Sequence, residues 1–382
     1  MYTSAHQLLP AFPGQHVLGP AIKRAEDLTA RAAELGGHAH PVTRAALREL
    51  LRNMNSYYSN RIEGQSTTPR NIDAALHQKF SDQPEIARLQ RIAVAHIDAE
   101  KALEASTVLG HPLNADSVLM AHRALYSRLE PIDRVTQDGA VIEPGQLRHA
   151  DVVVGRHAPP SWDSLPAFMA EFSRHYDREY AWAMRLIAIA CAHHRMAWIH
   201  PFMDGNGRAV RLQTHVAMLP ITHGLWSVSR GFARDTAAYY SALAAADLPR
   251  QGDLDGRGNL TEKGLLAWLD YFIAVCEDQL AYMSTMLALD GMKLRIKTAV
   301  HSEVARRLLR PEVALPVYHL FAAGPLTRGE FIQMTGLADR TGRAALSEAL
   351  KSGLVASDTS HAPVRFAFPV EMLPTLLPNL YG

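Results

Sequence analysis

The chain has 382 residues, enough for two or three domains of ordinary size, and 48% of them are hydrophobic, as is normal for a soluble core. The formal net charge of +1 gives no general attraction to nucleic acid or to anionic membranes. Of the two cysteines, Cys191 lies inside an apolar segment, so we expect neither a disulfide framework nor a zinc cluster. This cysteine usage fits a reducing compartment.

The first residues lack the basic start and apolar core of a secretory signal, and no segment offers the uninterrupted apolar length that a membrane span needs. We therefore expect a cytoplasmic protein without a membrane partner. The order of predicted elements suggests three regions: a helical N-terminal region (1–110), a central, nearly all-helical core (111–290) and a separate C-terminal region (291–382).

A helix is predicted from about Val42 to the glycine at position 64. Ser59 and Glu63 are four residues apart and therefore lie on one face of this helix. Gly64 suits the left-handed position that ends a helix. Taken alone, this pattern is an ordinary helix end.

Residues 145–160 contain a short β-branched run beside glycine and end in a double proline. This composition predicts a small hairpin or an edge strand. The candidate positions for it are Val152, Val153, Val154, Gly155, Arg156 and His157.

An Ala-rich apolar run from 180 to 199 predicts a buried helix that Pro201 ends, and a second apolar pattern predicts a helix beginning near Asn206 or Gly207. A helix N-terminus with two glycines is a site for anions, because phosphate oxygens can approach the backbone closely. Arg208 and Arg211 share one helix face and both can bind phosphate.

Two further side chains give this helix–loop–helix its chemistry. Asp204, beside a phosphate site, suits a Mg²⁺ ion that bridges phosphates. His200 can be neutral near pH 7 and can accept a proton. The segment from His200 to Arg211 therefore predicts the binding of a polyphosphate and the transfer of part of it to a hydroxyl.

A helix is also predicted to begin near Asp235, and it carries Tyr239 and Tyr240. Beyond position 313 the pattern gives three short helices, with Thr327 as the expected N-cap of the second, followed by two short strands. Three helices and a hairpin resemble a winged helix-turn-helix. Its acidic and basic residues nearly balance, so we expect a protein-interaction or homodimer role, with DNA binding as the less favoured alternative.

The segment from His200 to Arg211 resembles the Fic motif, His-Pro-Phe-x-Asp/Glu-Gly-Asn-Gly-Arg-x-x-Arg, and matches it at every fixed position. The resemblance implies a mainly α fold with a Fic-type helical core and a small β-hairpin flap, to which the C-terminal pattern adds a winged-helix-like domain. It also implies an enzyme, a nucleotidyltransferase that moves AMP from ATP to a Ser, Thr or Tyr hydroxyl of a target protein. ATP and Mg²⁺ are the implied substrate and metal.

The same resemblance implies residue roles. His200 is the base for the target hydroxyl, and Asp204 is the Mg²⁺ ligand. Phe202 is the implied apolar anchor under the loop, and Tyr239 or Tyr240 is implied to lie beside adenine. The implied phosphate contacts are Asn206 with the Gly205 and Gly207 amides at the α-phosphate, Arg208 at the β-phosphate and Arg211 at the γ-phosphate. Residues 152–157 are the implied flap that pairs with a target peptide.

Ser59 to Gly64 resembles the inhibitory motif Ser/Thr-x-x-x-Glu-Gly/Asn of many Fic proteins. The resemblance implies that Glu63 pairs with Arg211 and occupies the place of the γ-phosphate. Two alternatives stay open. The protein could remove AMP or transfer another phosphate-containing group, with Glu63 orienting a water. It could also be a DNA-binding or scaffold protein with a ligand-sensing core.

Overall fold

The computed structural model describes residues 2–37, 39–106, 111–136, 139–155 and 157–382. The chain divides into two compact units, and each is mainly helical. The first comprises Met1–Arg31, Asn55–His223 and Ser227–Gln279, and the second comprises Ala32–Met54, Gly224–Trp226 and Leu280–Gly382. The predicted mainly α fold is confirmed. The predicted three-region division stays a prediction.

In the described part of the chain, eight helices lie wholly within the first unit. They are α3 (Pro69–Leu76), α4 (Pro84–Ala105), α5 (Ala115–Tyr126), α6 (Leu165–Tyr176), α7 (Trp182–Ile199), α8 (Asn206–Thr222), α9 (Val228–Arg234) and α10 (Thr236–Asp247). Three more helices contribute residues to both units: α1 (Gly19–Leu35), α2 (Pro41–Ile62) and α11 (Glu262–Leu287).

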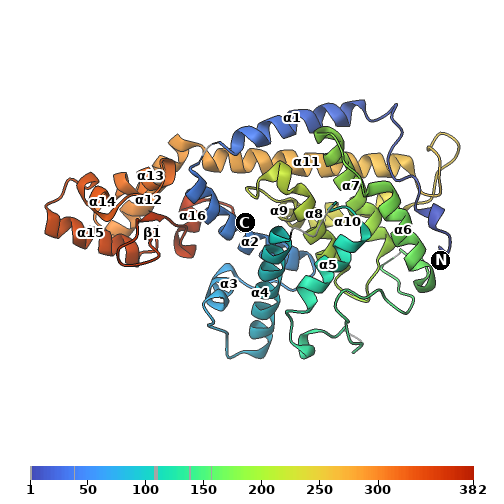
Figure 1. Ribbon diagram of the computed structural model, residues 1–382, viewed down its shortest axis with the longest axis horizontal. Coiled ribbons are helices and arrows are strands. Elements are labelled where there is room, and N and C mark those ends of the chain that lie inside the picture. The colour runs from blue at the N-terminus through green and yellow to red at the C-terminus, as the bar shows by residue number, and fades with distance from the viewer. Residues whose placement is uncertain (1, 38, 107–110, 137–138, 156) are drawn as a thin grey trace. The chain divides into compact units, whose positions relative to one another are not determined.

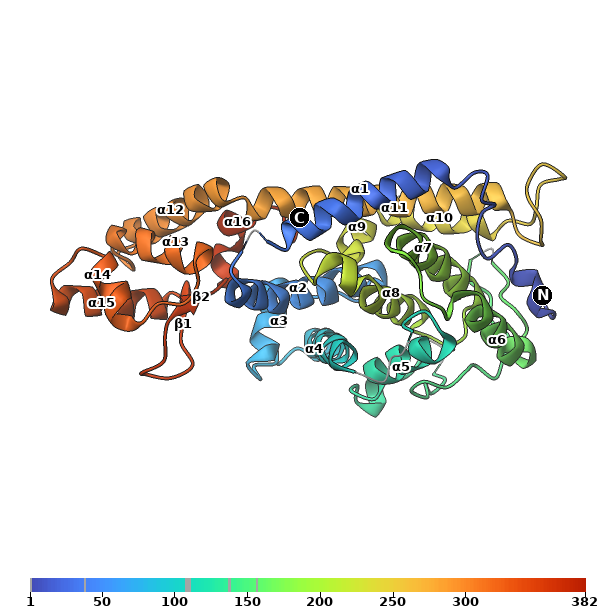
Figure 2. The same ribbon diagram turned by 45° about the horizontal axis from the view of Figure 1, so that its top comes forward.

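Helices α7 and α8 form the centre of the first unit, where they pack side by side (Figures 1 and 2). Helix α5 packs against α8 and α4, and α6 packs against α7. The Ala-rich, apolar sequence of α7 is buried over most of its length, as its lack of a polar face predicts. Trp268 of α11 donates a hydrogen bond from its indole nitrogen to the Ala190 carbonyl of α7 at 2.7 Å.

The second unit contains α12 (Leu289–Ala305), α13 (Ala314–Ala322), α14 (Arg328–Met334), α15 (Asp339–Lys351) and α16 (Leu373–Leu376). Thr327 is the N-cap of α14, as predicted, and forms a capping box with Glu330. Strands β1 (Val355–Ala356) and β2 (Arg365–Phe366) pair antiparallel, with Val355 opposite Phe366 (Figure 2). The elements follow the predicted order, and the winged-helix interpretation of them stays a prediction.

Short 3-10 turns connect the helices: η1 (Ala5–Leu8), η3 (Pro131–Asp133), η4 (Trp162–Ser164), η5 (Pro311–Val313) and η6 (Val370–Met372). Among the described residues, no helix combines the length and the apolar character that crossing a lipid bilayer requires.

Candidate active site

The loop between α7 and α8 is built by two left-handed residues. His200 ends α7 with φ 51° and Gly205 precedes α8 with φ 77°. A left-handed conformation suits glycine, whereas for histidine it is uncommon and has to be held by its surroundings. Arg148 supplies part of that support, because its Nε donates to the His200 carbonyl at 2.9 Å.

Asn206 closes this loop with both ends of its amide. Its Oδ1 accepts a hydrogen bond from the Phe202 backbone nitrogen at 2.8 Å, and its Nδ2 donates to the Phe202 carbonyl at 2.8 Å. Phe202 is fully buried beneath the loop and stacks on His122 with ring centroids 3.9 Å apart. The loop is therefore preorganised before any ligand binds.

His200 is neutral at physiological pH. Burial, and next the nearby His157, lower the pKa of His200 to about 4, although a hydrogen bond with the Ala197 backbone opposes the shift. A neutral imidazole that uses one ring nitrogen in such a bond keeps a lone pair on the other. This is the state in which His200 can accept a proton.

A cavity of about 780 Å³ opens beside the loop. Its lining includes His200, Asn206, Gly207 and Arg211, which are residues of the motif loop and the first turns of α8. A side chain at position 207 would collide with Glu63 Oε1 and come within 2.9 Å of Arg211 Nη1. Gly207 is therefore needed where these two side chains meet the backbone of α8.

Arg211 is held by the C-terminal turn of α2. Its Nε donates to Ser59 Oγ at 3.0 Å, and its Nη2 donates to the Ser59 carbonyl at 3.0 Å and to Glu63 Oε1 at 2.5 Å. The last carbonyls of a helix lack partners inside the helix and carry partial negative charge, so they favour a cation. Ser59 and Glu63 thus accept hydrogen bonds from Nε and Nη2, which are donors that Arg211 could otherwise offer to a phosphate.

The Asp204 carboxylate contacts side chains of α5 and α8. Tyr126 donates to Asp204 Oδ2 at 3.2 Å, and Arg208 lies 3.5 Å from the same oxygen. Arg208 also donates to the Tyr126 hydroxyl at 2.7 Å and to Gln65 Oε1 at 2.9 Å. Burial raises the pKa of Tyr126, so its hydroxyl keeps the proton that it shares with Asp204.

Comparison with known proteins identifies a family for the segment that carries the loop. Residues 112–218 match the family model described as the Fic/DOC family. This segment is a Fic/DOC domain. It contains α5, α6, α7, the loop between α7 and α8, and most of α8.

Two curated relatives are named protein adenylyltransferase Fic. The protein from Drosophila ananassae is 32% identical over 122 residues, which are 32% of this chain and 22% of the relative. The protein from Drosophila persimilis is 29% identical over 165 residues, which are 43% of this chain and 30% of the relative. The chain therefore spans less than a third of the length of these relatives.

Two solved structures share the fold. A Fic family protein from Desulfovibrio desulfuricans superposes with a TM-score of 0.51 at 19% identity, covering 94% of this chain and 98% of that one. A Fic domain containing signaling protein from Bacteroides thetaiotaomicron gives a TM-score of 0.53 at 17% identity, covering 69% of this chain and 96% of that one.

The predicted flap, residues 152–157, forms a single β-bridge in its described residues and no strand. Val154 and His157 form a single antiparallel bridge, with both backbone hydrogen bonds at 2.9 Å. Gly155 turns the chain with φ 59°, and Arg156 lies outside the described residues. Val152 and Val153 are in irregular backbone, and Val153 is 70% exposed. A turn at Gly155 and prolines after position 158 leave no room for a longer ladder.

Tyr239 and Tyr240 both line the cavity beside the Fic/DOC domain but have different surroundings. Tyr239 is buried, and its hydroxyl lies 3.0 Å from His193 Nε2. Tyr240 is 48% exposed and donates to the Ile62 carbonyl at 3.3 Å. Of the two, Tyr240 has the more exposed ring.

Sequence reasoning missed several residues that shape the site. Tyr126 and His122 lie one turn apart on α5, and His122 Nε2 lies 3.1 Å from the Asp204 carbonyl. Tyr126 and His122 precede Asp204 by 78 and 82 positions, and no sequence pattern links residues so far apart. Gln65 directly follows the Glu63–Gly64 pair and was the one detectable candidate, as a polar residue next to a predicted functional helix end.

Proposed function

We propose that the protein is an adenylyltransferase that moves AMP from ATP to a Ser, Thr or Tyr hydroxyl of a target protein. The observation that carries this proposal is the convergence of His200, Gly207 and Arg211 on one cavity at the N-terminus of α8. A proton acceptor thus lies beside a phosphate-binding backbone and a guanidinium. The curated relatives named as protein adenylyltransferases support the same reaction.

The proposed reaction is an in-line displacement at the α-phosphorus. The neutral His200 imidazole takes the proton of the target hydroxyl, whose oxygen forms a bond to the α-phosphorus. The bond from the α-phosphorus to the bridging oxygen breaks, and pyrophosphate leaves. The amides at the start of α8 and the Arg208 and Arg211 guanidiniums stabilise the charge on the phosphate oxygens.

The residues around Asp204 fit a Mg²⁺ site. Its side chain is 43% exposed, and Tyr126 and Arg208 hold one of its carboxylate oxygens in place. Carboxylate and phosphate oxygens are the ligands that Mg²⁺ takes in nucleotide sites, where the ion neutralises phosphate charge. Asp204 would hold the ion, and the contacts to Tyr126 and Arg208 would orient the carboxylate.

We further propose that Glu63 inhibits the enzyme. Its carboxylate contacts Arg211 at 2.5 Å and lines the cavity. A γ-phosphate bound by Arg211 would meet this carboxylate, and two anions at one guanidinium repel each other. ATP would then bind with its α-phosphorus displaced from the in-line position, and about 1 Å of displacement costs on the order of a hundredfold in rate.

The target would bind at the flap by its backbone. Val153 and Val154 are exposed apolar residues, and Val154 also lines the cavity. Backbone pairing with an extended peptide makes little demand on its sequence. For the C-terminal region (291–382) we propose a role in protein interaction or dimer formation, with DNA binding less favoured, because its acidic and basic residues nearly balance.

The proposal is tested with the Glu63→Gly variant, ATP and a cell lysate. We expect one target or a few to gain the mass of one AMP on a hydroxyl residue, identified by mass spectrometry. The converse incubation, with an isolated AMP-modified target and no ATP, separates the alternatives. Release of AMP by the wild-type protein that Glu63→Gly abolishes would instead favour AMP removal with Glu63 orienting water.

A further inference from the structure

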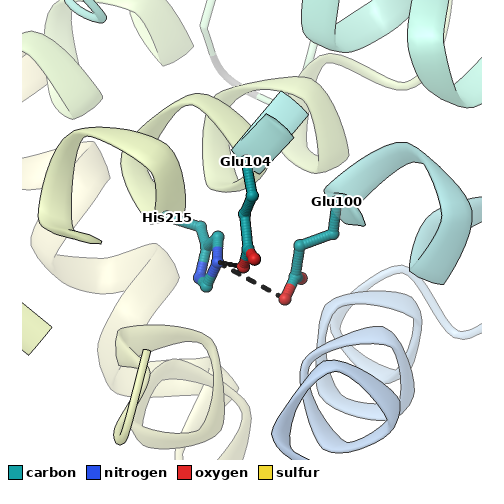
Figure 3. A group of neighbouring side chains, drawn as sticks. All are labelled: Glu100, Glu104 and His215. Carbon is teal, nitrogen blue, oxygen red and sulfur yellow. Dashed lines mark hydrogen bonds and ion pairs between the residues drawn. The ribbon is translucent and has the colours of Figure 1, made fainter. Parts of the chain in front are cut away.

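A cluster of polar side chains lies between α4 and α8 outside the cavity (Figure 3). Glu100 and Glu104 stand one turn apart on α4, and both point toward His215 of α8. His215 Nε2 lies 2.8 Å from Glu104 Oε1 and 3.4 Å from Glu100 Oε1. One ligand atom from each residue lies within 4.8 Å of the other two, so a single ion can be bound by all three.

The three side chains are well shielded from solvent. Their exposed fractions are 1% for Glu100, 8% for Glu104 and 9% for His215. Bringing carboxylates out of water is costly unless positive charge accompanies them. A divalent ion bound by the three side chains would supply such charge.

A buried amide points to a ligand at the same place. Asn55 of α2 donates from Nδ2 to Glu100 Oε1 at 3.0 Å, and the same nitrogen lies 3.5 Å from His215 Nδ1. Asn55 is 4% exposed, and its Oδ1 has no hydrogen-bond partner within the described ranges. Buried carbonyl oxygens are nearly always hydrogen-bonded, so this atom suits a water on a bound ion.

A second buried group on α4 agrees with this interpretation. His96 lies one turn before Glu100 on the same helix face, and it is 1% exposed. Neither ring nitrogen of His96 has a hydrogen-bond partner in the part of the chain that the structure describes. Burial lowers the pKa of His96 to about 3, so the ring is neutral and can accept a hydrogen bond from a water on a nearby ion.

We propose that Glu100, Glu104 and His215 form a binding site for a divalent transition-metal ion that ties α4 to α8. One imidazole and two carboxylates are a ligand set that zinc accepts, whereas Mg²⁺ favours oxygen ligands alone. The site is distinct from Asp204, which is proposed to bind a metal with nucleotide phosphates.

The position of this site connects it to the inhibitory helix. On α2, Asn55 precedes Ser59 by one turn, and on α8 Arg211 precedes His215 by one turn. Asn55 approaches His215 while Ser59 bonds Arg211. An ion held by His215 therefore stabilises the pairing of α2 with α8 one turn away from the Arg211 contacts.

The test is zinc binding to the full chain after chelator treatment, in the absence of ATP. Isothermal titration with Zn²⁺ should give one site per chain, and Mg²⁺ should give none at the same concentrations. Glu104→Gln and His215→Gln should each weaken Zn²⁺ binding by about tenfold or more, since even loss of an outer-shell group costs that much. Thermal unfolding should shift upward with Zn²⁺ in the wild type and not in these variants.

A matched control exists on α6, where Glu171 Oε1 and His175 Nε2 lie 3.0 Å apart. Among the described residues, this pair belongs to no group of three possible metal ligands. Glu171→Gln should bind Zn²⁺ as the wild type does. An independent readout uses the wild-type protein loaded with Cu²⁺, so it does not depend on whether a variant folds. The EPR spectrum of this protein should show one imidazole nitrogen coordinated to Cu²⁺. Absence of a one-to-one Zn²⁺ site, unchanged binding in both variants, or several nitrogens on Cu²⁺ would overturn the proposal and leave an imidazolium–carboxylate ion pair.

Discussion

Glu63 and Arg211 are separated by 148 positions, yet their side chains meet at 2.5 Å. Arg211 is 2% exposed, and Glu63 retains 28% exposure on the cavity side. A partly exposed carboxylate on a buried guanidinium can be displaced by another anion, because the guanidinium stays fixed by Ser59. This arrangement gives the proposed inhibition a separable anchor, Ser59, and a separable blocking group, Glu63.

Removing the anchor should relieve inhibition only in part. Ser59→Ala deletes the hydroxyl that accepts from Arg211 Nε but leaves the Ser59 carbonyl and Glu63 in place. A hydrogen bond of this kind contributes about 0.5–1.5 kcal/mol, so AMP transfer should rise by about tenfold at most. Ser56→Ala, which removes a hydroxyl bonded to the Ala93 carbonyl on the same helix, is the matched control and should leave transfer unchanged. Equal changes in AMP transfer by the two variants would show that Ser59 acts only through the stability of α2.

Replacing the proposed base should abolish transfer without abolishing nucleotide binding. His200→Ala in the Glu63→Gly background should lower the transfer rate by about a hundredfold or more, the usual contribution of a general base. ATP affinity, measured by titration calorimetry, should change little, because the glycine amides and arginines remain. His149→Ala, at an exposed position, is the control. Transfer at the parent rate would remove His200 from the mechanism.

The low pKa of His200 predicts an unusual pH profile. Because burial lowers the pKa of His200 to about 4, the imidazole is neutral, and so active, at every pH well above 4. For Glu63→Gly with saturating Mg²⁺, kcat/KM should stay level between pH 8 and pH 6, since it reports the free enzyme. An ordinary histidine, with a pKa of about 6.5, would give a clear loss over that interval. A fall centred near pH 6.5 that His149→Ala shares would contradict the assignment of His200 as a buried neutral base.

Tyr126 should act as a positioning residue for Asp204 and Arg208. Tyr126→Phe removes the hydroxyl that donates to Asp204 and accepts from Arg208. We expect the apparent Mg²⁺ requirement and the KM for ATP to rise severalfold, with kcat changed less. Tyr176→Phe is matched in burial, and its hydroxyl donates to the Ala11 carbonyl away from the site. If both variants lose stability alike and neither changes the Mg²⁺ dependence, Tyr126 serves the fold alone.

The local structure of the site could be predicted from the sequence because its signals are local. Pro201 places the end of α7, and Gly205 supplies the left-handed residue before α8. The sequence predicts a helix end near Gly64 on the same grounds, and Gly64 has φ 68°. In each case the backbone conformation is set by the preference of one residue and its immediate neighbours.

The contacts that hold the site together could not be predicted in the same way. Tyr126 reaches Asp204, and Arg148 reaches the His200 carbonyl, across distances in sequence that no periodicity encodes. At the predicted flap, a local sequence pattern predicts more structure than the chain forms. The β-branched run at 152–154 predicted a strand, yet the backbone there pairs only at Val154, because strand formation needs a partner segment that the chain does not supply locally.

AMP transfer restrained by Glu63 can be followed with ATP that carries label on the α- or the γ-phosphate. Wild type, Glu63→Gly and Glu63→Gly/His200→Ala are compared for covalent label on protein. We predict that α-label accumulates on Glu63→Gly about a hundredfold faster than on wild type, that γ-label does not, and that the double variant is labelled no faster than wild type. Equal α-labelling of wild type and Glu63→Gly, or transfer of the γ-label, would contradict the account.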